Sequence, residues 1–185
     1  MNRPGARSIS VRLNADEALG DRVLKVNHAG ENGAVHIYSG QILIARITAP
    51  GLVPELIEFR RHEIHHRAIF QAELERRGVR RCRSYVLCGA GGWVLGALTA
   101  FCGRRAIGAT TVAVEQVVLA HLVEQIAALR GQDDAAVAAI SSIVEEEQQH
   151  HDSGIRLAAG KAWCAVLTPL VSASTRFVIW AGMHL

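Results

Sequence analysis

One four-residue motif occurs twice in this chain, each time at the same distance behind a glutamate. The motif is Glu-x-x-His, and its two copies begin at Glu63 and Glu147. Each copy follows by 32 residues a glutamate in an apolar stretch, Glu31 or Glu115. A shift of 84 residues also aligns Ala29 with Ala113, Gln41 with Gln125, Ile42 with Ile126 and Arg46 with Arg130. The repeat predicts two equivalent helical hairpins, and therefore a four-helix bundle.

The residue types of this repeat indicate a dinuclear metal site. Positions i and i+3 share a helix face, so one Glu-x-x-His can direct both side chains toward one ion. The candidate ligands are Glu31, Glu63, His66, Glu115, Glu147 and His150. Four carboxylates and two neutral imidazoles carry a charge of −4, which balances two divalent ions such as Fe(II) or Mn(II). The competing interpretation is a set of surface glutamates or paired core charges, but no Lys or Arg lies within one turn of Glu31 or Glu115.

The remaining pattern predicts one all-α domain, a ferritin-like di-iron or di-manganese bundle over residues 21–185 after an N-terminal extension, 1–20. Expected helices cover residues 23–47, 54–77, 106–130, 134–159 and 162–182. The extension lacks the apolar core of a signal peptide, so we expect no export. Four cysteines form no Cys-x-x-Cys pair, which favours reduced thiols in a cytosolic protein.

The segment between the two hairpins is basic and then apolar. Residues 76–114 contain seven arginines and no acid, so they carry +7 while the rest of the chain carries −4. Five of these arginines precede the 20 uncharged residues 84–103, and we call them the arginine cluster: Arg76, Arg77, Arg80, Arg81 and Arg83. A helix of 20 residues spans about 30 Å, enough to cross a bilayer core.

A single crossing would place the two halves of the ligand set on opposite sides of the membrane. We therefore expect residues 76–105 to lie in the membrane interface, or to dip in and return, with arginines on anionic headgroups. The glycines that would allow a return are Gly89, Gly91, Gly92 and Gly96. The alternative is a buried crossover helix. Nucleic acid binding is not expected, because no recognition motif accompanies the charge.

Other side chains near the motifs are candidates for supporting roles. His28 lies one turn before Glu31 and could orient it, although a cap or a surface position would suit it equally. Tyr38 and His121 lie two turns beyond Glu31 and Glu115, with core packing as the alternative for Tyr38. Three further histidines point about 100° away from the ligand face, so we expect solvated or indirect roles for them. They are His62, His65 and His151.

Several segments together resemble the demethoxyubiquinone hydroxylase family of ubiquinone biosynthesis. They are NHAGE at 27–31, IYSGQ at 37–41, TVAVE at 111–115 and HHDSG at 150–154, beside the two Glu-x-x-His motifs. The resemblance implies a carboxylate-bridged di-iron monooxygenase that uses O2 to hydroxylate a polyprenyl methoxy-benzoquinol. It implies Glu31 and Glu115 as terminal ligands and Glu63 and Glu147 as bridges. His66 and His150 would be the imidazole ligands, and His121 would lie near the metal pocket.

The same resemblance implies peripheral attachment to a membrane, for which we expect the cytoplasmic face of a bacterial cell membrane. NADH or a reduced quinol is the expected electron source, and an accessory lipid-binding protein is a candidate partner. Three other functions use part of the same pattern. A ferroxidase or iron-storage bundle would use the same ligands, and a di-iron quinol oxidase would add lipid contact. A non-enzymatic membrane adaptor would need only residues 76–114.

Overall fold

The computed structural model describes residues 9–158 and 161–184, and within them every regular element is helical. The elements are α1 (Leu19–Thr48), η1 (Pro50–Leu52), α2 (Val53–Arg76), α3 (Tyr85–Phe101), α4 (Arg104–Leu129), α5 (Asp134–Ser141), α6 (Val144–Leu157) and α7 (Lys161–His184). The predicted all-α class is confirmed. Residues 1–8 of the predicted extension, and the predicted end of a helix at residue 159, lie outside the described residues.

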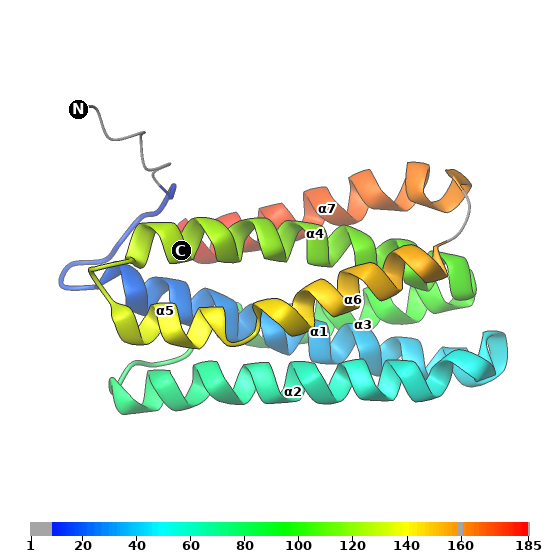
Figure 1. Cartoon of the computed structure of the whole chain (residues 1–185), viewed down its shortest axis with the longest axis horizontal. Helices are drawn as coiled ribbons and strands as arrows, with labels where there is room; N and C mark the ends of the chain where they lie inside the picture. Colours follow the sequence, from blue (N-terminus) through cyan, green and yellow to red (C-terminus); the bar gives the residue numbers. More distant parts are fainter. Residues whose placement is uncertain (1–8, 159–160, 185) are drawn as a thin grey trace.

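Two helical hairpins form the bundle (Figure 1). The first pairs α1 with α2, and Pro50 in the 3-10 turn between them has no backbone N–H with which to prolong α1. The second pairs α4 with the consecutive helices α5 and α6. Gly131, at φ +73°, turns the chain after α4, and the Asp133 side chain caps α5 by accepting a hydrogen bond from the N–H of Ala136 at 3.0 Å. These are the hairpins that the 84-residue repeat predicts.

The predicted helix 134–159 is interrupted, which corrects the sequence-based expectation. α5 ends at Ser141, and α6 begins at Val144. The Ser142 hydroxyl donates to the carbonyl of Ala139 at 2.8 Å, so it competes for the backbone acceptors of the last turn. Ile143 is fully buried and its N–H makes only a long i−3 bond, 3.4 Å, to Ile140. A buried isoleucine at a tightened turn therefore separates the two helices.

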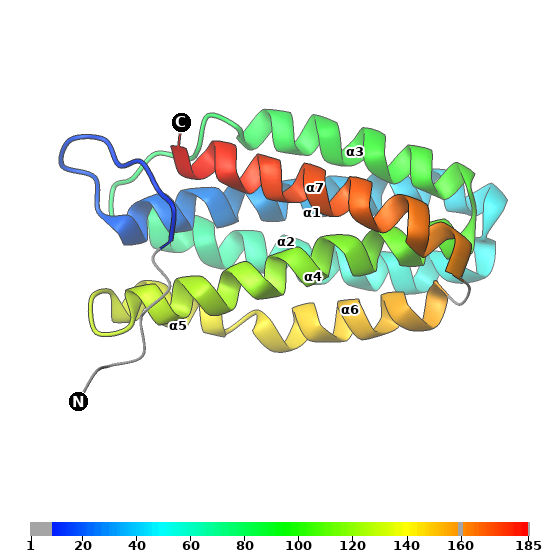
Figure 2. The same cartoon turned by 90° about the horizontal axis from the view of Figure 1, so that it is seen from above.

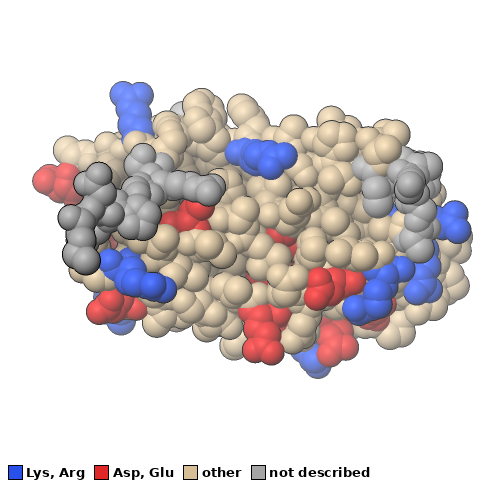
Figure 3. Space-filling model, turned by 45° about the horizontal axis from the view of Figure 1, so that its top comes forward, with Lys and Arg blue, Asp and Glu red and all other residues tan. Residues whose placement is uncertain are grey.

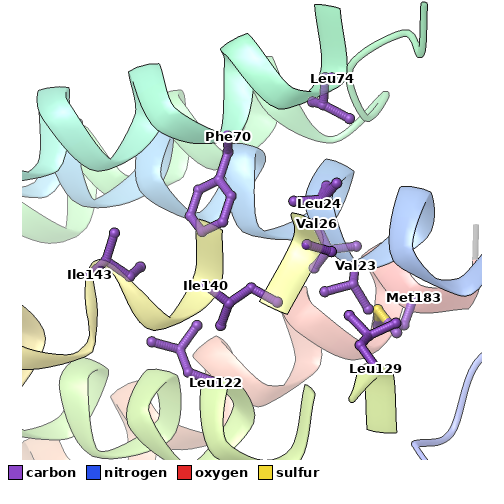
Figure 4. Packing of buried hydrophobic residues seen from close by; sticks show 11 residues of the cluster. Val23, Leu24, Val26, Phe70, Leu74, Leu122, Leu129, Ile140, Ile143 and Met183 are labelled. Carbon is purple, nitrogen blue, oxygen red and sulfur yellow. The ribbon is translucent and has the colours of Figure 1, made fainter. Parts of the chain in front are cut away.

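Apolar side chains from five helices fill one end of the bundle (Figure 4). Phe70 of α2 and Ile140 of α5 are both fully buried there. α7 contributes Met183, which shows that the C-terminal helix belongs to the core and not only to the surface. Burying each large apolar side chain stabilises the fold by about 1.5–3 kcal/mol. This packing aligns the hairpins, and the predicted metal ligands occupy the middle of the bundle.

The helix α3 packs lengthwise on α1 and is continuous, so the expected dip and return within residues 84–103 is wrong. Its glycines serve close packing. A Cβ on Gly96 would lie 2.8 Å from the carbonyl carbon of Ile37 and closer still to its oxygen, and one on Gly92 would meet the backbone of Gly33. Gly103, at φ +85°, turns the chain from α3 into α4.

The outer face of α3 is not covered, so the buried-crossover alternative is also wrong. Its exposed apolar side chains are Val86, Leu87, Trp93, Val94, Leu98 and Phe101. α7, the last helix of the chain, likewise exposes Val166, Leu170, Phe177, Val178 and Trp180. In Figure 2, α3 and α7 lie toward one edge of the molecule, and α5 and α6 lie toward the opposite edge.

Candidate metal centre

The six predicted ligands lie together inside the bundle, each side chain coming from a core helix. α1 supplies Glu31, α2 supplies Glu63 and His66, α4 supplies Glu115, and α6 supplies Glu147 and His150. None of the six residues is more than 5% exposed. Side chains from both halves of the chain therefore converge on one buried site.

These side chains form two overlapping groups, each able to hold an ion. One group is Glu31, Glu63, His66 and Glu147, and the other is Glu63, Glu115, Glu147 and His150. In each group, the candidate ligand atoms all lie within 4.8 Å of one another. Glu63 and Glu147 belong to both groups, which is the position that a bridging carboxylate would occupy between two ions.

Helical spacing explains this convergence, and the distances show that the halves interlock. The His66 Nδ1 lies 3.7 Å from its own motif partner Glu63, but 3.0 Å from Glu147 of the other half. The His150 Nδ1 lies 3.7 Å from Glu147 and 3.0 Å from Glu63. Each imidazole therefore faces the carboxylate of the opposite motif.

The donor atoms fit a pair of divalent ions. Glu63 Oε1, Glu147 Oε2 and His150 Nδ1 are buried without a hydrogen-bond partner among the described residues. The pair His150 Nδ1 and Glu63 Oε1 is close at 3.0 Å, yet it is not aligned as a hydrogen bond. Buried polar atoms left in this way are costly unless a cation satisfies them. Four carboxylates with two imidazoles are a suitable donor set for first-row ions.

The electrostatics of the cluster favour added positive charge. Burial, and then the negative charges of Glu147 and Glu63, raise the pKa of Glu31 and of Glu115 well above the usual range. Burial also acts to raise the pKa of Glu63, but the nearby imidazoles of His150 and His66 outweigh it and hold that pKa well below the usual range. Protons or metal ions must therefore neutralise the excess negative charge.

The two imidazoles are held in a strongly negative environment. Burial alone would lower the pKa of His66, but the hydrogen bond to Glu147 and the nearby carboxylate of Glu63 raise it to about 11. The same opposition raises the pKa of His150 to about 9, so its carboxylate partners also outweigh burial. Bound metal ions would take the place of these protons, because a ligating nitrogen must be unprotonated.

Three predicted supporting residues lie in different places. The Tyr38 hydroxyl donates to Glu115 Oε1 at 3.3 Å, and the ring also packs in the core. His121 is half-buried and lines the cavity described below, with its Nδ1 3.8 Å from Glu124. His28 is buried against the ring of Tyr85, 4.8 Å between centroids, so the surface alternative is wrong. Within the described structure it forms no hydrogen bond to Glu31.

Two side chains contact the ligand histidines from behind, and the sequence predicts only one of them. His62 contacts His150, with 3.0 Å between His62 Nδ1 and His150 Nε2, which agrees with an indirect role. Sequence reasoning missed Glu146, whose Oε2 lies 2.7 Å from His66 Nε2. Applying the 84-residue shift to His62 would have found it. The other two histidines set aside in the sequence stay away from the cluster: His65 is exposed, and His151 pairs with Asp152 at 3.1 Å.

A cavity of about 450 Å³ extends from the carboxylates to the surface, and the sequence did not reveal it. Its walls come from α1, α3, α4 and α7, with mainly apolar side chains such as Ile37, Leu95 and Val118. Glu31, Glu63, Glu115 and Glu147 line its inner end. The cluster is therefore accessible to an apolar molecule that enters beside α3 and α7.

Relatives of known function share most of this chain. It is 32% identical over 167 residues to the NADPH-dependent 3-demethoxyubiquinone 3-hydroxylase of Dictyostelium discoideum, covering 86% of this chain and 75% of the relative. It is 38% identical over 118 residues to the 5-demethoxyubiquinone hydroxylase of Saccharomyces cerevisiae, covering 64% of this chain and 51% of the relative. A bacterial relative, the 3-demethoxyubiquinol 3-hydroxylase of Rhodospirillum rubrum, is 33% identical over 139 residues, with 72% of this chain and 64% of the relative covered.

The chain thus spans between half and three quarters of the length of these relatives. A family model, described as ubiquinone biosynthesis protein COQ7, matches residues 18–182. That match includes every helix of the bundle and all six residues of the candidate metal centre, as well as most of α7. The chain belongs to the ubiquinone biosynthesis protein COQ7 family.

Proposed function

We propose that this chain is a di-iron monooxygenase that uses O2 to hydroxylate a demethoxyubiquinone-type ring in ubiquinone biosynthesis. The observation that carries the proposal is the apolar cavity that ends at the four carboxylates. Membership of the COQ7 family and the names of the relatives support the same reaction. A storage bundle would need the carboxylates but not an apolar route to them.

The size and lining of the cavity suit a quinol head with part of a polyprenyl tail. Pockets for organic ligands usually measure about 300–1,000 Å³, so 450 Å³ accommodates a substituted ring. The ring would lie at the inner end beside Glu31 and Glu115. The tail would leave between α3 and α7, where Leu87 and Phe177 line the cavity and are also exposed.

The residues of the chain would hold and isolate the reacting groups. In the proposed site, two bound iron ions would supply the reduction of O2 that a hydroxylation requires. Glu63 and Glu147 would hold both ions, and the remaining four ligands would each hold one. The apolar walls would exclude water, while the Tyr38 hydroxyl keeps Glu115 oriented.

A substrate with a polyprenyl tail requires access to a membrane, and the exposed faces of α3 and α7 would provide it. By length and composition, the described structure has two helices apolar enough to cross a bilayer, α4 and residues 165–184 of α7. α4 is mostly buried in the bundle and carries Glu115, which argues against α4 as a span. Figure 3, an oblique view onto the α7 side, shows few charged side chains over the middle of that face.

We infer peripheral attachment through α3 and α7, at the cytoplasmic face of a bacterial membrane. Arg80, Arg81 and Arg83 of the arginine cluster are exposed and would meet anionic headgroups; Arg81 also lies over the Tyr85 ring, 4.7 Å from its centroid. Arg77 is not, because Asp133, Asp21 and Glu73 surround its guanidinium within 3.0 Å. Fewer arginines are thus available to contact a membrane than the sequence predicts.

The electron source and the accessory partner are further parts of the proposal. Several relatives are named NADPH-dependent. Since NADH is also a nicotinamide nucleotide, these names support a nucleotide of this kind as the electron source, in preference to a reduced quinol. An accessory lipid-binding protein that delivers the quinol stays a prediction from the family resemblance. A di-iron quinol oxidase is the second candidate function, because the same cavity would admit its quinol.

The quinone content of cells tests the proposed function. Cells without this protein should accumulate a quinone that lacks one methoxy group of ubiquinone. The wild-type protein should restore ubiquinone, and Glu115→Ala should not, since that variant lacks one proposed ligand. His65→Ala is the matched control, because His65 is exposed beside the ligand His66. An unchanged quinone profile in the deletion strain would refute the proposed reaction.

A further inference from the structure

The outward nitrogens of the two candidate ligand histidines have chemically different partners. Both rings turn Nδ1 toward the candidate ligand carboxylates, Glu147 for His66 and Glu63 for His150, and Nε2 away from them. The His66 Nε2 lies 2.7 Å from a carboxylate oxygen of Glu146, whereas the His150 Nε2 lies 3.0 Å from the His62 ring. One imidazole is thus backed by a carboxylate, and the other by a second imidazole ring.

These two partners occupy equivalent positions in the repeat. His62 and Glu146 are 84 residues apart, and each immediately precedes the glutamate of its motif. Each reaches across the bundle to the histidine of the opposite half. The geometry is therefore symmetric while the chemistry is not, so the difference resides in the identity of these two side chains.

Such partners alter how strongly an imidazole binds a metal ion. A ring that binds an ion through Nδ1 carries its proton on Nε2 and donates it outward. A carboxylate acceptor draws that proton more strongly than a neutral imidazole does, which makes the ring a stronger ligand. Changes to such partners typically alter metal affinity about 10–100-fold. An ion bound by His66 would therefore gain more affinity from the outer hydrogen bond of that ring than an ion bound by His150 would.

A second difference between the halves acts in the same direction. The Tyr38 hydroxyl donates to Glu115 Oε1 at 3.3 Å and so withdraws charge from that carboxylate. The equivalent residue 84 positions later is Leu122, which has no donor to offer Glu31. Glu115 and His150 belong to one ion group, and Glu31 and His66 to the other. Both differences therefore weaken binding at the Glu115 side.

We propose that Glu146 and His62 are positioning residues that make the two metal positions unequal. The ion held by Glu31 and His66 binds more tightly and loads first, and the ion held by Glu115 and His150 follows. This inference rests on the metal centre of the proposed function, but not on its substrate or reaction.

Manganese binding to single-position variants of the full-length chain tests the inference without an activity assay. Glu115→Ala leaves the four donors of the His66 group, and Glu31→Ala leaves the four donors of the His150 group. Calorimetric titration of each metal-free variant with Mn(II) then gives the affinity of one position. We expect tighter binding in the Glu115→Ala protein than in the Glu31→Ala protein.

Further substitutions should act on one position each. Added to Glu115→Ala, Glu146→Gln should weaken Mn(II) binding about tenfold, and added to Glu31→Ala it should change little. His62→Glu should do the reverse, strengthening binding about tenfold in the Glu31→Ala protein only. The matched controls are Glu145→Gln and His65→Gln, because both residues are exposed neighbours of the ligand region. Neither should change either affinity.

The comparison of Glu146→Gln with Glu145→Gln decides the role of Glu146. If Glu146→Gln weakens both positions equally, or no more than Glu145→Gln does, the role of Glu146 is refuted. Electron paramagnetic resonance of the unsubstituted protein with one equivalent of Mn(II) provides a test that needs no variant. Ordered loading predicts the spectrum of isolated Mn(II), and a dominant spectrum of coupled pairs would overturn it. A protein that binds no metal at all would instead refute the proposed function.

Discussion

The close contact between α3 and α1 should make two glycines of the same helix respond oppositely to alanine. At Gly96 a new Cβ would lie 2.8 Å from the Ile37 carbonyl carbon and 2.9 Å from its Cα. These are backbone atoms of a buried helix and cannot rotate away. At Gly91 nothing lies within 4 Å of the Cβ position. Gly91→Ala is therefore the matched control for Gly96→Ala.

The magnitudes follow from two opposing effects. Alanine in place of a helical glycine stabilises by about 0.5–1 kcal/mol, because it restricts the unfolded chain. Overpacking of a tight contact costs roughly 1–3 kcal/mol. Gly91→Ala should show only the gain. Gly96→Ala should show a net loss of about 1–2 kcal/mol, and for a chain of this size each kcal/mol shifts Tm by about 2–4 °C.

Urea unfolding of the metal-free protein, followed by far-UV circular dichroism, measures both differences. The two variants should differ by about the full overpacking cost, since their helix gains cancel. Equal stability of the two proteins would refute the close packing of α3 on α1. A stabilised Gly96→Ala protein would refute it as well.

Other features of the structure lead to three further expected results. Glu147→Ala should lose both metal ions together in metal analysis, because it removes a shared ligand, and His65→Ala should lose neither; a Glu147→Ala protein that retains two ions would contradict the bridge. Glutamine at Arg80, Arg81 and Arg83 should reduce binding to anionic vesicles, and added salt should mimic the loss. Flotation insensitive to both would exclude a basic contact. Burial opposes ionisation of Glu17, but ion pairs with Arg22 and Lys25 outweigh it and lower its pKa to about 2, so its stabilisation should be present above pH 4.5 and fade as the pH falls toward 2. The stability difference from Glu17→Gln should shrink over that range, and a constant difference would refute the pairing.

Much of the fold followed from regular spacing. The i, i+3 motifs and the 84-residue repeat predict which helix faces meet, because a helix has a fixed rotation per residue. The same regularity explains why Glu31 and Glu147, remote in sequence, face one interior. The break between α5 and α6 could not be predicted from this spacing. The break at Ser142 and Ile143 depends on how a buried isoleucine packs, which no short-range pattern reveals.

The parts that sequence reasoning missed depend on contacts between helices. The glycines of residues 84–103 are compatible with a chain that turns in a membrane, and only the packing partner shows that they let α3 approach α1. The cavity arises because four helices leave a space between them, so no single segment encodes it. Glu146 lies within a run of three glutamates, and only its tertiary contact with His66 distinguishes it from Glu145.

In the proposed reaction, one oxygen atom of O2 enters the quinol ring at the inner end of the cavity. Mass spectrometry of the product formed under 18O2, from purified iron-loaded protein with a demethoxyubiquinone-type substrate and a reductant, tests it most directly. We expect one 18O atom in the new ring hydroxyl, and no labelled product from Glu115→Ala. Consumption of O2 without label in the ring would refute hydroxylation and identify a quinol oxidase instead.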